Sequence, residues 1–375
     1  MKIGVDIRSL EKQPSGVSIY LEKLLENLFN IDQQNQYYLF YNAFSQSADS
    51  VKEKFNYPNC HFCFSRTPNK IFNFKQTFLR SPKIDQLIGE IDLFFMPNLN
   101  FAAISRKTDL VITVHDLSYQ FYPSLFTLKR RLWHSFVYPK LLFKKAKLII
   151  AVSANTKKDL IDVYKIPDSK IKVIYSGIDQ AETNQPRKNT RALPDLADNF
   201  ILSLCNLEPR KNIESIILAF DQIKRNGYQG QLVICGKPGW SYKNIYKLAK
   251  KSPFCQSIKF LGYVDDEDKK NLLVAADLLV YPSFYEGFGF PPLEAMAAGT
   301  PVITSYNSSL PEVVKDLALL IDPYNLTELV KAIEVSLDNI KEKDDVADLG
   351  TSNSQKFTWQ QTAGQTLELF ESLSP

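Results

Sequence analysis

Short apolar runs alternate with longer amphipathic segments along most of the chain. Lys2–Ile7 predicts a buried strand, and Val17–Phe29 repeats apolar residues at the spacing of one helix face. Further strand-like runs follow at Tyr37–Tyr41, Ile91–Met96, Leu110–Val114, Leu148–Val152 and Lys172–Tyr175. Strands that alternate with helices are typical of doubly wound α/β proteins rather than of barrels or sandwiches. These six strands therefore predict one Rossmann-like sheet.

A polar stretch at 179–199, DQAETNQPRKNTRALPDLADN, interrupts the pattern. It holds two prolines and no aromatic or β-branched aliphatic residue, which predicts a linker over 181–194. The linker separates a first domain, 1–180, from a second domain, 195–357, in which strand-like runs resume. These runs are Phe200–Leu204, Leu232–Cys235, Ile258–Leu261, Asp277–Tyr281, Pro301–Thr304 and Ala318–Ile321. The predicted fold is α/β with two Rossmann-like domains and a final helix at about 358–375.

The stretch YPSFYEGFGFPPLEAMAAGTPVIT at 281–304 carries the strongest chemical signal. It follows a buried strand, and its two glycines and double proline predict a tight loop that opens a helix. This places Glu286 in the loop and Glu294 in the first helical turn. Backbone amides at such a turn suit a diphosphate or a polyol, and each carboxylate can accept two hydrogen bonds from a diol. An isolated E-x7-E is more often a solvated loop glutamate beside one that favours the helix dipole.

A second candidate turn, NLEPRKN at 206–212, follows the first strand of the second domain. Arg210 can contact a diphosphate with two hydrogen bonds and Lys211 can add a point charge. Taken alone, such a pair is more often an ordinary solvated pair in front of a helix. Gly236, at the end of the next strand, can approach a nucleotide base or serve an ordinary turn.

In the first domain, Gly16 and His115 are the candidate site residues. Gly16 opens the first helix, whose amides can face a phosphate, although helices often begin with Ser-Gly. His115 ends the strand VITV, where a neutral imidazole can hydrogen-bond a sugar hydroxyl or instead cap the following turn.

Composition narrows the class of protein. A chain of 375 residues with 45% hydrophobic and 23% charged residues is an ordinary globular protein of about two domains. Residues 1–190 carry 27 Lys and Arg against 17 Asp and Glu, whereas residues 191–375 carry 18 against 24, so the two halves face different partners. No signal peptide or membrane span is predicted, and we expect a cytoplasmic protein, at most attached to the inner face of the membrane.

No metal or other cofactor is expected. The five cysteines are an odd set, and Cys60 and Cys63 lack the second pair that a zinc site needs. The acidic run at 265–268 is interpreted as the start of a helix rather than a cation site.

Residues 126–150, FTLKRRLWHSFVYPKLLFKKAKLII, interleave seven Lys and Arg with large apolar side chains. A basic amphipathic segment can rest on an anionic membrane. The alternative is an ordinary helix that packs its apolar face on the sheet, and the sequence slightly favours it.

The motifs HDLSYQFYP (115–123), EPRKN (208–212) and YEGFGFPPLEAM (285–296) together resemble the retaining GT-B glycosyltransferases of family four, and bacterial mannosyltransferases of polysaccharide assembly in particular. The resemblance implies two domains with a cleft between them and a last helix that crosses back to the first domain. It also implies transfer of a hexose, first mannose, from a GDP- or UDP-linked sugar to a glycan or lipid-linked acceptor without a metal. No nucleic acid is expected among the partners.

The resemblance also assigns roles to single residues. Glu286 would hold the hexose with the Gly287 and Gly289 amides, and Glu294 the ribose. Lys211 would hold the diphosphate. The family's usual Gly-Arg is replaced here by Cys205-Asn206, so that the arginine role falls to Arg210 or is missing. The predicted catalytic residues are His115, Arg210, Lys211 and Glu286, and the predicted donor-binding residues are Gly16, Asn206, Gly236, Gly287, Phe288, Gly289 and Glu294.

Other functions compatible with this fold remain open. One is a GT-B sugar-nucleotide epimerase; a phosphorylase would need a pyridoxal lysine and a far longer chain. Another is a catalytically silent subunit that still binds a sugar nucleotide. Hydrolysis of the donor that depends on Glu286 and Lys211 distinguishes an enzyme from such a subunit.

Overall fold

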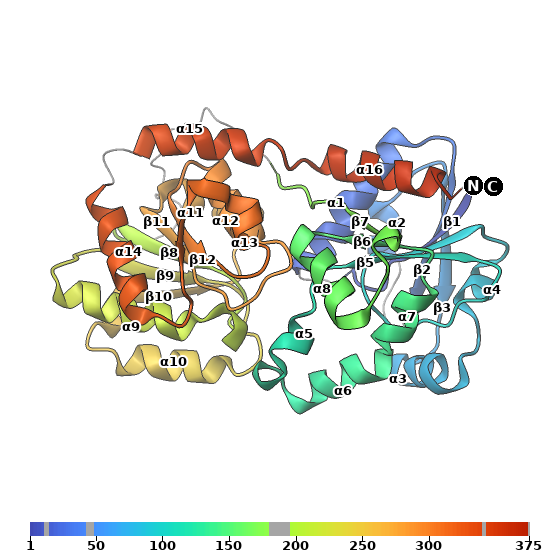
Figure 1. Cartoon of the computed structure of the whole chain (residues 1–375), viewed down its shortest axis with the longest axis horizontal. Helices are drawn as coiled ribbons and strands as arrows, with labels where there is room; N and C mark the ends of the chain where they lie inside the picture. Colours follow the sequence, from blue (N-terminus) through green and yellow to red (C-terminus); the bar gives the residue numbers. More distant parts are fainter. Residues whose placement is uncertain (11–14, 43–48, 180–195, 340–342, 374–375) are drawn as a thin grey trace. The chain divides into compact units, whose positions relative to one another are not determined.

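The computed structural model describes the chain except residues 11–14, 43–48, 180–195, 340–342 and 374–375. It divides into two compact units (Figure 1). Unit 1 consists of Met1–Gly177 and Thr358–Pro375, and unit 2 of Ile178–Phe357. The sequence-based boundaries are 180 and 195, and the predicted linker, 181–194, lies outside the described residues.

Unit 1 contains one sheet of parallel strands in the order β3-β2-β1-β4-β5-β6-β7. The strands are β1 Lys2–Asp6, β2 Gln36–Asn42, β3 Cys60–Ser65, β4 Leu93–Met96, β5 Asp109–Val114, β6 Leu148–Ala151 and β7 Ile171–Val173. The helices are α1 Gly16–Ile31, α2 Asp49–Lys54, α3 Asn69–Phe74, α4 Ile84–Ile88, α5 Ser118–Phe121, α6 Leu128–Val137, α7 Pro139–Lys145, α8 Ala154–Tyr164 and α16 Trp359–Glu371. The described residues thus hold seven strands in this sheet, where the sequence predicts six.

The additional strand is β3, at the edge of the sheet. Its sequence, CHFCFS, is only partly buried, and a half-exposed edge strand lacks the continuous apolar run of a central parallel strand. Side chains of a strand alternate between faces, so Cys60 and Cys63, three positions apart, point to opposite sides of the sheet. They cannot hold one metal ion together.

Unit 2 repeats the doubly wound arrangement, with parallel strands in the order β10-β9-β8-β11-β12-β13. The strands are β8 Phe200–Leu204, β9 Gln231–Cys235, β10 Ile258–Gly262, β11 Leu278–Tyr281, β12 Val302–Ser305 and β13 Leu319–Ile321. The helices are α9 Ile213–Arg225, α10 Tyr242–Lys251, α11 Asp266–Ala275, α12 Phe290–Ala297, α13 Leu310–Val314, α14 Leu326–Asp338 and α15 Lys343–Ser354. β8, β11 and β12 are buried along their whole length, as strands covered by helices on both faces must be.

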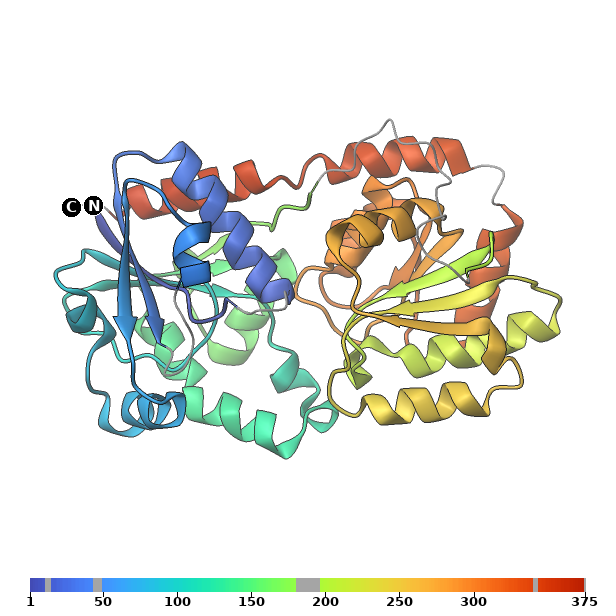
Figure 2. The same ribbon diagram turned by 180° about the vertical axis from the view of Figure 1, so that it is seen from behind.

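The last helix of the chain belongs to unit 1. Thr358 caps α16 by accepting a hydrogen bond from the Gln361 amide, and α16 then packs along α1 (Figure 2). Phe370 is fully buried with its ring 5.1 Å from that of Phe95 in β4. The backbone at Gly177 packs closely against the start of α16, because a Cβ on Gly177 would lie 2.3 Å from the Trp359 amide nitrogen. None of the helices in the described part of the chain is long and apolar enough to cross a bilayer.

Candidate active site

The candidate site lies at the carboxyl ends of β8 and β11 in unit 2. These strands are neighbours in the sheet, and the strand order reverses between them. Connections on either side of such a reversal run in opposite directions and leave a crevice, which is where open α/β sheets bind ligands. The loop after β8 carries Arg210 and Lys211, and the loop after β11 carries Glu286. The backbones of the two loops are joined, since the Phe284 amide donates to the Arg210 carbonyl at 3.0 Å.

The turn after β8 is shaped so that both cations point toward Glu286. Pro209–Lys211 forms a 3-10 turn, and Asn212 has a left-handed backbone with a φ of 56°. An asparagine adopts that conformation at a lower cost than most residues, and its side-chain amide donates to the Pro323 carbonyl at 2.8 Å. The start of α9 is thereby fixed directly after the two cations.

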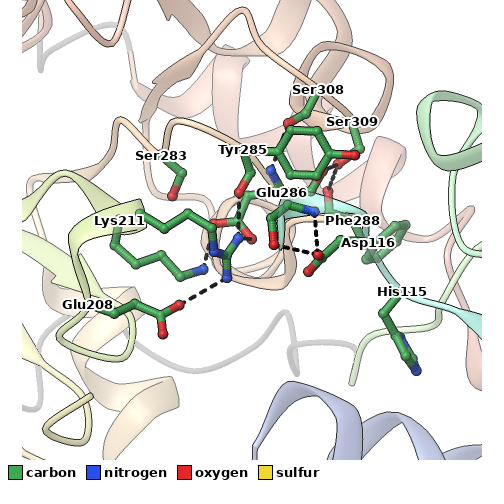
Figure 3. A network of polar contacts seen from close by, with 12 residues as sticks. His115, Asp116, Glu208, Lys211, Ser283, Tyr285, Glu286, Phe288, Ser308 and Ser309 are labelled. Carbon is green, nitrogen blue, oxygen red and sulfur yellow. Dashed lines mark hydrogen bonds and ion pairs between the residues drawn. The ribbon is translucent and has the colours of Figure 1, made fainter. Parts of the chain in front are cut away.

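Arg210, Lys211 and Tyr281 converge on the Glu286 carboxylate. Figure 3 labels Lys211, Glu208 and Glu286 in this cluster. Lys211 Nζ donates to Glu286 Oε1 at 2.5 Å and to the Tyr281 hydroxyl at 2.7 Å. The Tyr281 hydroxyl donates to Glu286 Oε1 at 2.9 Å, and Arg210 Nη1 donates to Glu286 Oε2 at 2.9 Å. Arg210 also donates to Glu208 at 3.0 Å and to the Tyr285 carbonyl.

The electrostatics of this cluster keep Glu286 ionised. Burial disfavours its charge, but the Arg210 and Lys211 charges and the hydrogen bond from Lys211 outweigh burial and lower its pKa to about 2. The Tyr281 hydroxyl stays protonated, because burial and the neighbouring Glu286 charge raise its pKa well above the ordinary value. A carboxylate held in this way positions other groups and is a poor proton donor near neutral pH.

Side chains of the turn after β12 form hydrogen bonds with the backbone of the Glu286 loop. The Glu286 amide donates to Ser308 Oγ at 2.8 Å, and its carbonyl accepts from Ser309 Oγ at 3.0 Å. Ser309 Oγ also donates to the Phe288 carbonyl at 2.9 Å, so one buried hydroxyl contacts both residues that flank Gly287. The Gly289 that follows has a φ of 108°, the left-handed geometry that the sequence predicts for this turn.

Glu294 lies farther into its helix than the sequence predicts. α12 begins at Phe290, directly after Gly289, and includes both prolines in its first turn. Glu294 therefore falls beyond the first turn, where the helix dipole acts less on it. Its carboxylate accepts from Lys269 Nζ of α11 at 2.8 Å, and both side chains are largely buried.

The remaining predicted residues of unit 2 have mixed surroundings. Asn206 is exposed at the end of β8. Gly236 has a φ of 145°, and a Cβ on it would lie 1.8 Å from the Cys205 carbonyl oxygen, so backbone packing alone requires a glycine there.

The acidic run at 265–268 does begin a helix: Asp265 caps α11 by accepting from the Asp268 amide at 2.8 Å. No three His, Cys, Asp or Glu side chains gather as a metal site would need within the described ranges.

Unit 1 places Gly16 and His115 at the carboxyl ends of β1 and β5. Gly16 is the exposed first residue of α1, behind a capping box made by Ser15 and Ser18. His115 Nε2 lies 2.8 Å from the Pro97 carbonyl oxygen, which can only accept, so Nε2 carries the proton. Burial lowers the pKa of His115, against the opposing effects of that bond and of Asp116. The imidazole is therefore neutral near pH 7, with Nδ1 as an acceptor.

Sequence motifs do not identify Tyr281, Glu208, Ser308 or Ser309 as part of this cluster. The sequence predicts Tyr281 only as a strand residue, and its position at the end of that strand is the one signal for a role in the site. Glu208 stands two residues before Arg210, within the EPRKN motif itself. The two serines follow β12, whose carboxyl end lies beside that of β11.

Comparison with known proteins identifies the family. Residues 184–352 match the glycosyl transferases group 1, and residues 14–182 match Glycosyltransferase Family 4. The O-antigen chain mannosyltransferase B of Escherichia coli is 31% identical over 282 residues, which cover 73% of this chain and 73% of that protein.

Solved structures match over nearly the whole chain at lower identity. Sucrose-phosphate synthase from Thermosynechococcus elongatus has a TM-score of 0.76 at 21% identity and covers 99% of this chain and 98% of its own. HepE of Anabaena, solved with UDP-glucose, has a TM-score of 0.72 at 20% identity and covers 99% of this chain and 100% of its own.

The two Rossmann-like units and these matches define a glycosyltransferase of GT-B fold, which confirms the predicted fold class and the predicted resemblance. The chain belongs to the glycosyl transferases group 1 family.

Proposed function

We propose that this glycosyltransferase moves a hexose, first mannose, from a nucleoside diphosphate sugar to a hydroxyl of a glycan or lipid-linked acceptor, with retention at the anomeric carbon. The observation that carries the proposal is the convergence of Arg210, Lys211 and Tyr281 on Glu286 at the strand-order reversal of unit 2. Two largely buried cations beside a carboxylate provide for both parts of such a donor: the cations suit a diphosphate, and the carboxylate suits sugar hydroxyls.

Glu286 is proposed to hold the hexose hydroxyls. Its pKa of about 2 argues against a role as acid or base, because the group does not exchange a proton near neutral pH. Lys211 and Arg210 are proposed to hold the diphosphate and to stabilise the charge that grows on it. Gly16, Asn206, Gly236, the Gly287–Gly289 turn and Glu294 are proposed to complete the donor site. Nδ1 of His115 can accept a hydrogen bond from a hexose hydroxyl.

In the proposed reaction the bond between the anomeric carbon and the phosphate oxygen breaks. The acceptor oxygen forms its bond on the same face of the sugar, and its proton passes to an oxygen of the leaving phosphate. The protein contributes positioning and charge stabilisation, since Glu286 is already engaged by two cations. Lys211 and Arg210 supply the positive charge that a divalent cation would otherwise bring, and we therefore propose that the reaction needs none.

The named activity of the relatives favours mannose. O-antigen chain mannosyltransferase B of E. coli makes GDP-mannose the first donor to test, and the UDP-glucose complex of HepE makes UDP-glucose the second. A shift in thermal midpoint on addition of GDP or UDP tells the two apart, because a nucleotide that binds only the folded state stabilises it. Polysaccharide or glycoconjugate synthesis is the proposed context.

The deciding experiment is a donor panel with and without EDTA, with release of the nucleotide and the anomer of the product as readouts. Glu286→Ala and Lys211→Ala should each abolish turnover while the protein stays folded, whereas Lys243→Ala, an exposed lysine on α10, should not. Full activity of both site variants would disprove the site assignment. Conversion of the donor into a different sugar, with neither transfer to an acceptor nor simple hydrolysis, would indicate an epimerase, and binding without turnover a silent subunit.

We further propose that the enzyme works at the cytoplasmic face of a membrane. α6, within the basic segment 126–150, buries only Val137 and leaves Leu128, Leu132, Trp133 and Phe136 exposed. α7 is different, since Leu142 and Phe143 pack into unit 1 as in an ordinary helix. Sedimentation with anionic vesicles that high salt reverses supports membrane contact, and no sedimentation at low salt excludes it.

A further inference from the structure

A hollow in unit 1 is lined by residues of the segments that follow β3, β4 and β5 in the sequence. It has a cavity volume of about 80 Å³, and it is bounded by the π-helical turn Lys75–Leu79, the loop at 101–104, and α6 and α7. In Figures 1 and 2, α3 and α6 lie next to each other, and the Thr77 hydroxyl donates to the Phe136 carbonyl at 3.4 Å. The walls of the hollow come from three separate parts of the sequence.

Three cations line this hollow: Arg80, Lys83 and Lys145. None of them forms an ion pair with any residue that the structure describes, and no acidic side chain is among the lining residues. The nearby acid, Asp85, is buried and accepts from the Ser105 amide at 2.8 Å and from Thr108 Oγ1 at 3.2 Å. The three cations of the hollow therefore lack a paired acidic side chain within the described residues.

The positive charges around the hollow repel one another. Burial, together with the charges of Lys83, Arg106 and Arg80, lowers the pKa of Lys145, while Asp85 acts in the opposite direction. Lys145 donates to the Ile104 carbonyl, a neutral acceptor. Such an arrangement raises the energy of the empty site, and a bound anion would relieve the repulsion.

The other walls of the hollow are apolar. Phe101 and Leu142 form its buried side, while Phe136 and Leu141, exposed by 42% and 43%, form its rim. From Phe136 the exposed apolar surface continues to Phe78, with ring centroids 5.9 Å apart, and from there to Phe74 at 5.0 Å. Phe74, Phe78 and Leu79 are each more than half exposed. An apolar surface of this kind, continuous with a basic hollow, fits a ligand with an anionic head and an apolar chain.

We propose that this hollow binds a phosphate ester carried on an apolar chain: Arg80, Lys83 and Lys145 hold the phosphate, and the chain leaves over Phe136 and Phe78. The ligand is either the phosphate of the lipid-linked acceptor or the headgroup of an anionic membrane lipid. The proposal deepens the proposed function, since it gives the acceptor side of the enzyme a phosphate-specific site.

Geranyl phosphate is a suitable first probe, with geraniol and inorganic phosphate as its two halves, and calorimetry on the full chain without any sugar nucleotide as the measurement. Geranyl phosphate should bind at least about tenfold more tightly than either half. The double substitution Arg80→Gln/Lys83→Gln should weaken it by about tenfold or more. Lys129→Gln/Lys140→Gln, which removes the same charge from exposed positions on α6 and α7, should leave binding within about twofold.

Two results would overturn the proposal. One is the absence of geranyl phosphate binding to the native chain, and the other is an equal loss in both double variants, which would mean that only the general positive charge of the surface matters. Neither depends on the donor site, because no sugar nucleotide is present and folding is checked by the unfolding midpoint. A failure of the proposed glycosyl transfer would leave this readout unchanged.

Vesicles then distinguish the two sources of the ligand. Phosphatidylcholine vesicles are prepared with farnesyl phosphate or with phosphatidylglycerol at equal surface charge. Binding to the first kind alone, lost in Arg80→Gln/Lys83→Gln, assigns the hollow to a lipid-linked phosphate. Equal binding to both kinds, lost in the same variant, assigns it to bulk lipid headgroups. Vesicle binding that the variant retains contradicts the hollow as the site of contact.

Discussion

Glu286 is buried, and it is surrounded by two cations and a hydroxyl that contact its carboxylate within 2.9 Å. A carboxylate in that position contributes to folding as well as to ligand binding, since the same contacts that hold a sugar also keep Arg210 and Lys211 from being buried without a counter-charge. Two predictions at the residue scale separate these contributions.

The first concerns acid stability. The pKa of Glu286 is about 2 in the folded protein and 4.5 for the ordinary group, so its ionised form is favoured by folding. This stabilisation, on the order of 3 kcal/mol by linkage, is complete above the ordinary value and is lost as the pH falls toward 2. Glu286→Gln lacks it at every pH. In urea unfolding, the difference between native and variant protein should therefore shrink across that window, and a difference that stays constant would contradict the pairing.

The second concerns Tyr281, whose hydroxyl accepts from Lys211 and donates to Glu286. Tyr281→Phe keeps the ring but removes one partner from each of two buried charged groups. We expect a loss of about 1–2 kcal/mol in the free energy of unfolding and a fall in kcat/KM for the donor. Tyr324→Phe is the control, because Tyr324 is 66% exposed in the same unit. Equal effects of the two substitutions would show that the Tyr281 hydroxyl contributes no more to stability or to kcat/KM than an exposed hydroxyl does.

At the scale of elements, backbone packing explains a glycine that the sequence assigned to the donor. Gly236 ends β9 with a φ of 145° and has the Cys205 carbonyl where a Cβ would stand, whereas Gly262, at the end of β10, has a φ of 73° and nothing within 4 Å. Gly236→Ala should cost about 3 kcal/mol or more, because the ends of β8 and β9 must separate, and Gly262→Ala about 1 kcal/mol from backbone strain alone. Thermal unfolding of both variants measures the contrast.

The outcome also bears on the role of Gly236. If Gly236→Ala folds normally but no longer binds the nucleotide, the glycine serves the ligand rather than the packing of β8 against β9.

A strand is predictable from the sequence where it is buried, because its consecutive residues are then apolar. Phe200–Leu204 is apolar and fully buried, and its predicted and observed bounds agree. β3 is not predicted, because an edge strand is only half buried. An ordinary helix is one of the two interpretations of the segment 126–150, and the structure divides that segment into α6 and α7 at Tyr138, which has a φ of 54°. A left-handed tyrosine follows from tertiary packing and carries no local signal.

The candidate site was predictable as a set of residues but not as a network. Arg210, Lys211 and Glu286 were each singled out by motif, yet the contacts between them join positions 75 and 76 apart in the sequence. Only the adjacency of β8 and β11 in the sheet brings them together, and a linear pattern does not encode that adjacency. The same holds for Ser308 and Ser309, which come to Glu286 from beyond β12.

At the scale of the whole molecule, the chain begins and ends in the same unit. α16 contributes Phe370 to the core of unit 1, where the ring contacts Phe95 of β4, and the Trp359 ring lies 6.0 Å from Tyr20 of α1. Unit 1 therefore includes residues that follow all of unit 2 in the sequence. Its stability should depend on residues that stand after all of unit 2 in the sequence.

Phe370→Ala tests this dependence, because Phe370 is fully buried and the substitution leaves a cavity under α16. Unit 1 should lose about 3–5 kcal/mol of stability. Hydrogen exchange should accelerate at the amides of β4 and α1, while the amides of β8 and β9 in unit 2 keep their protection. Glu368→Ala, an exposed position on the same helix, should change neither. Faster exchange in β8 and β9 to the same extent would mean that the two units unfold as one and that α16 is not specific to unit 1.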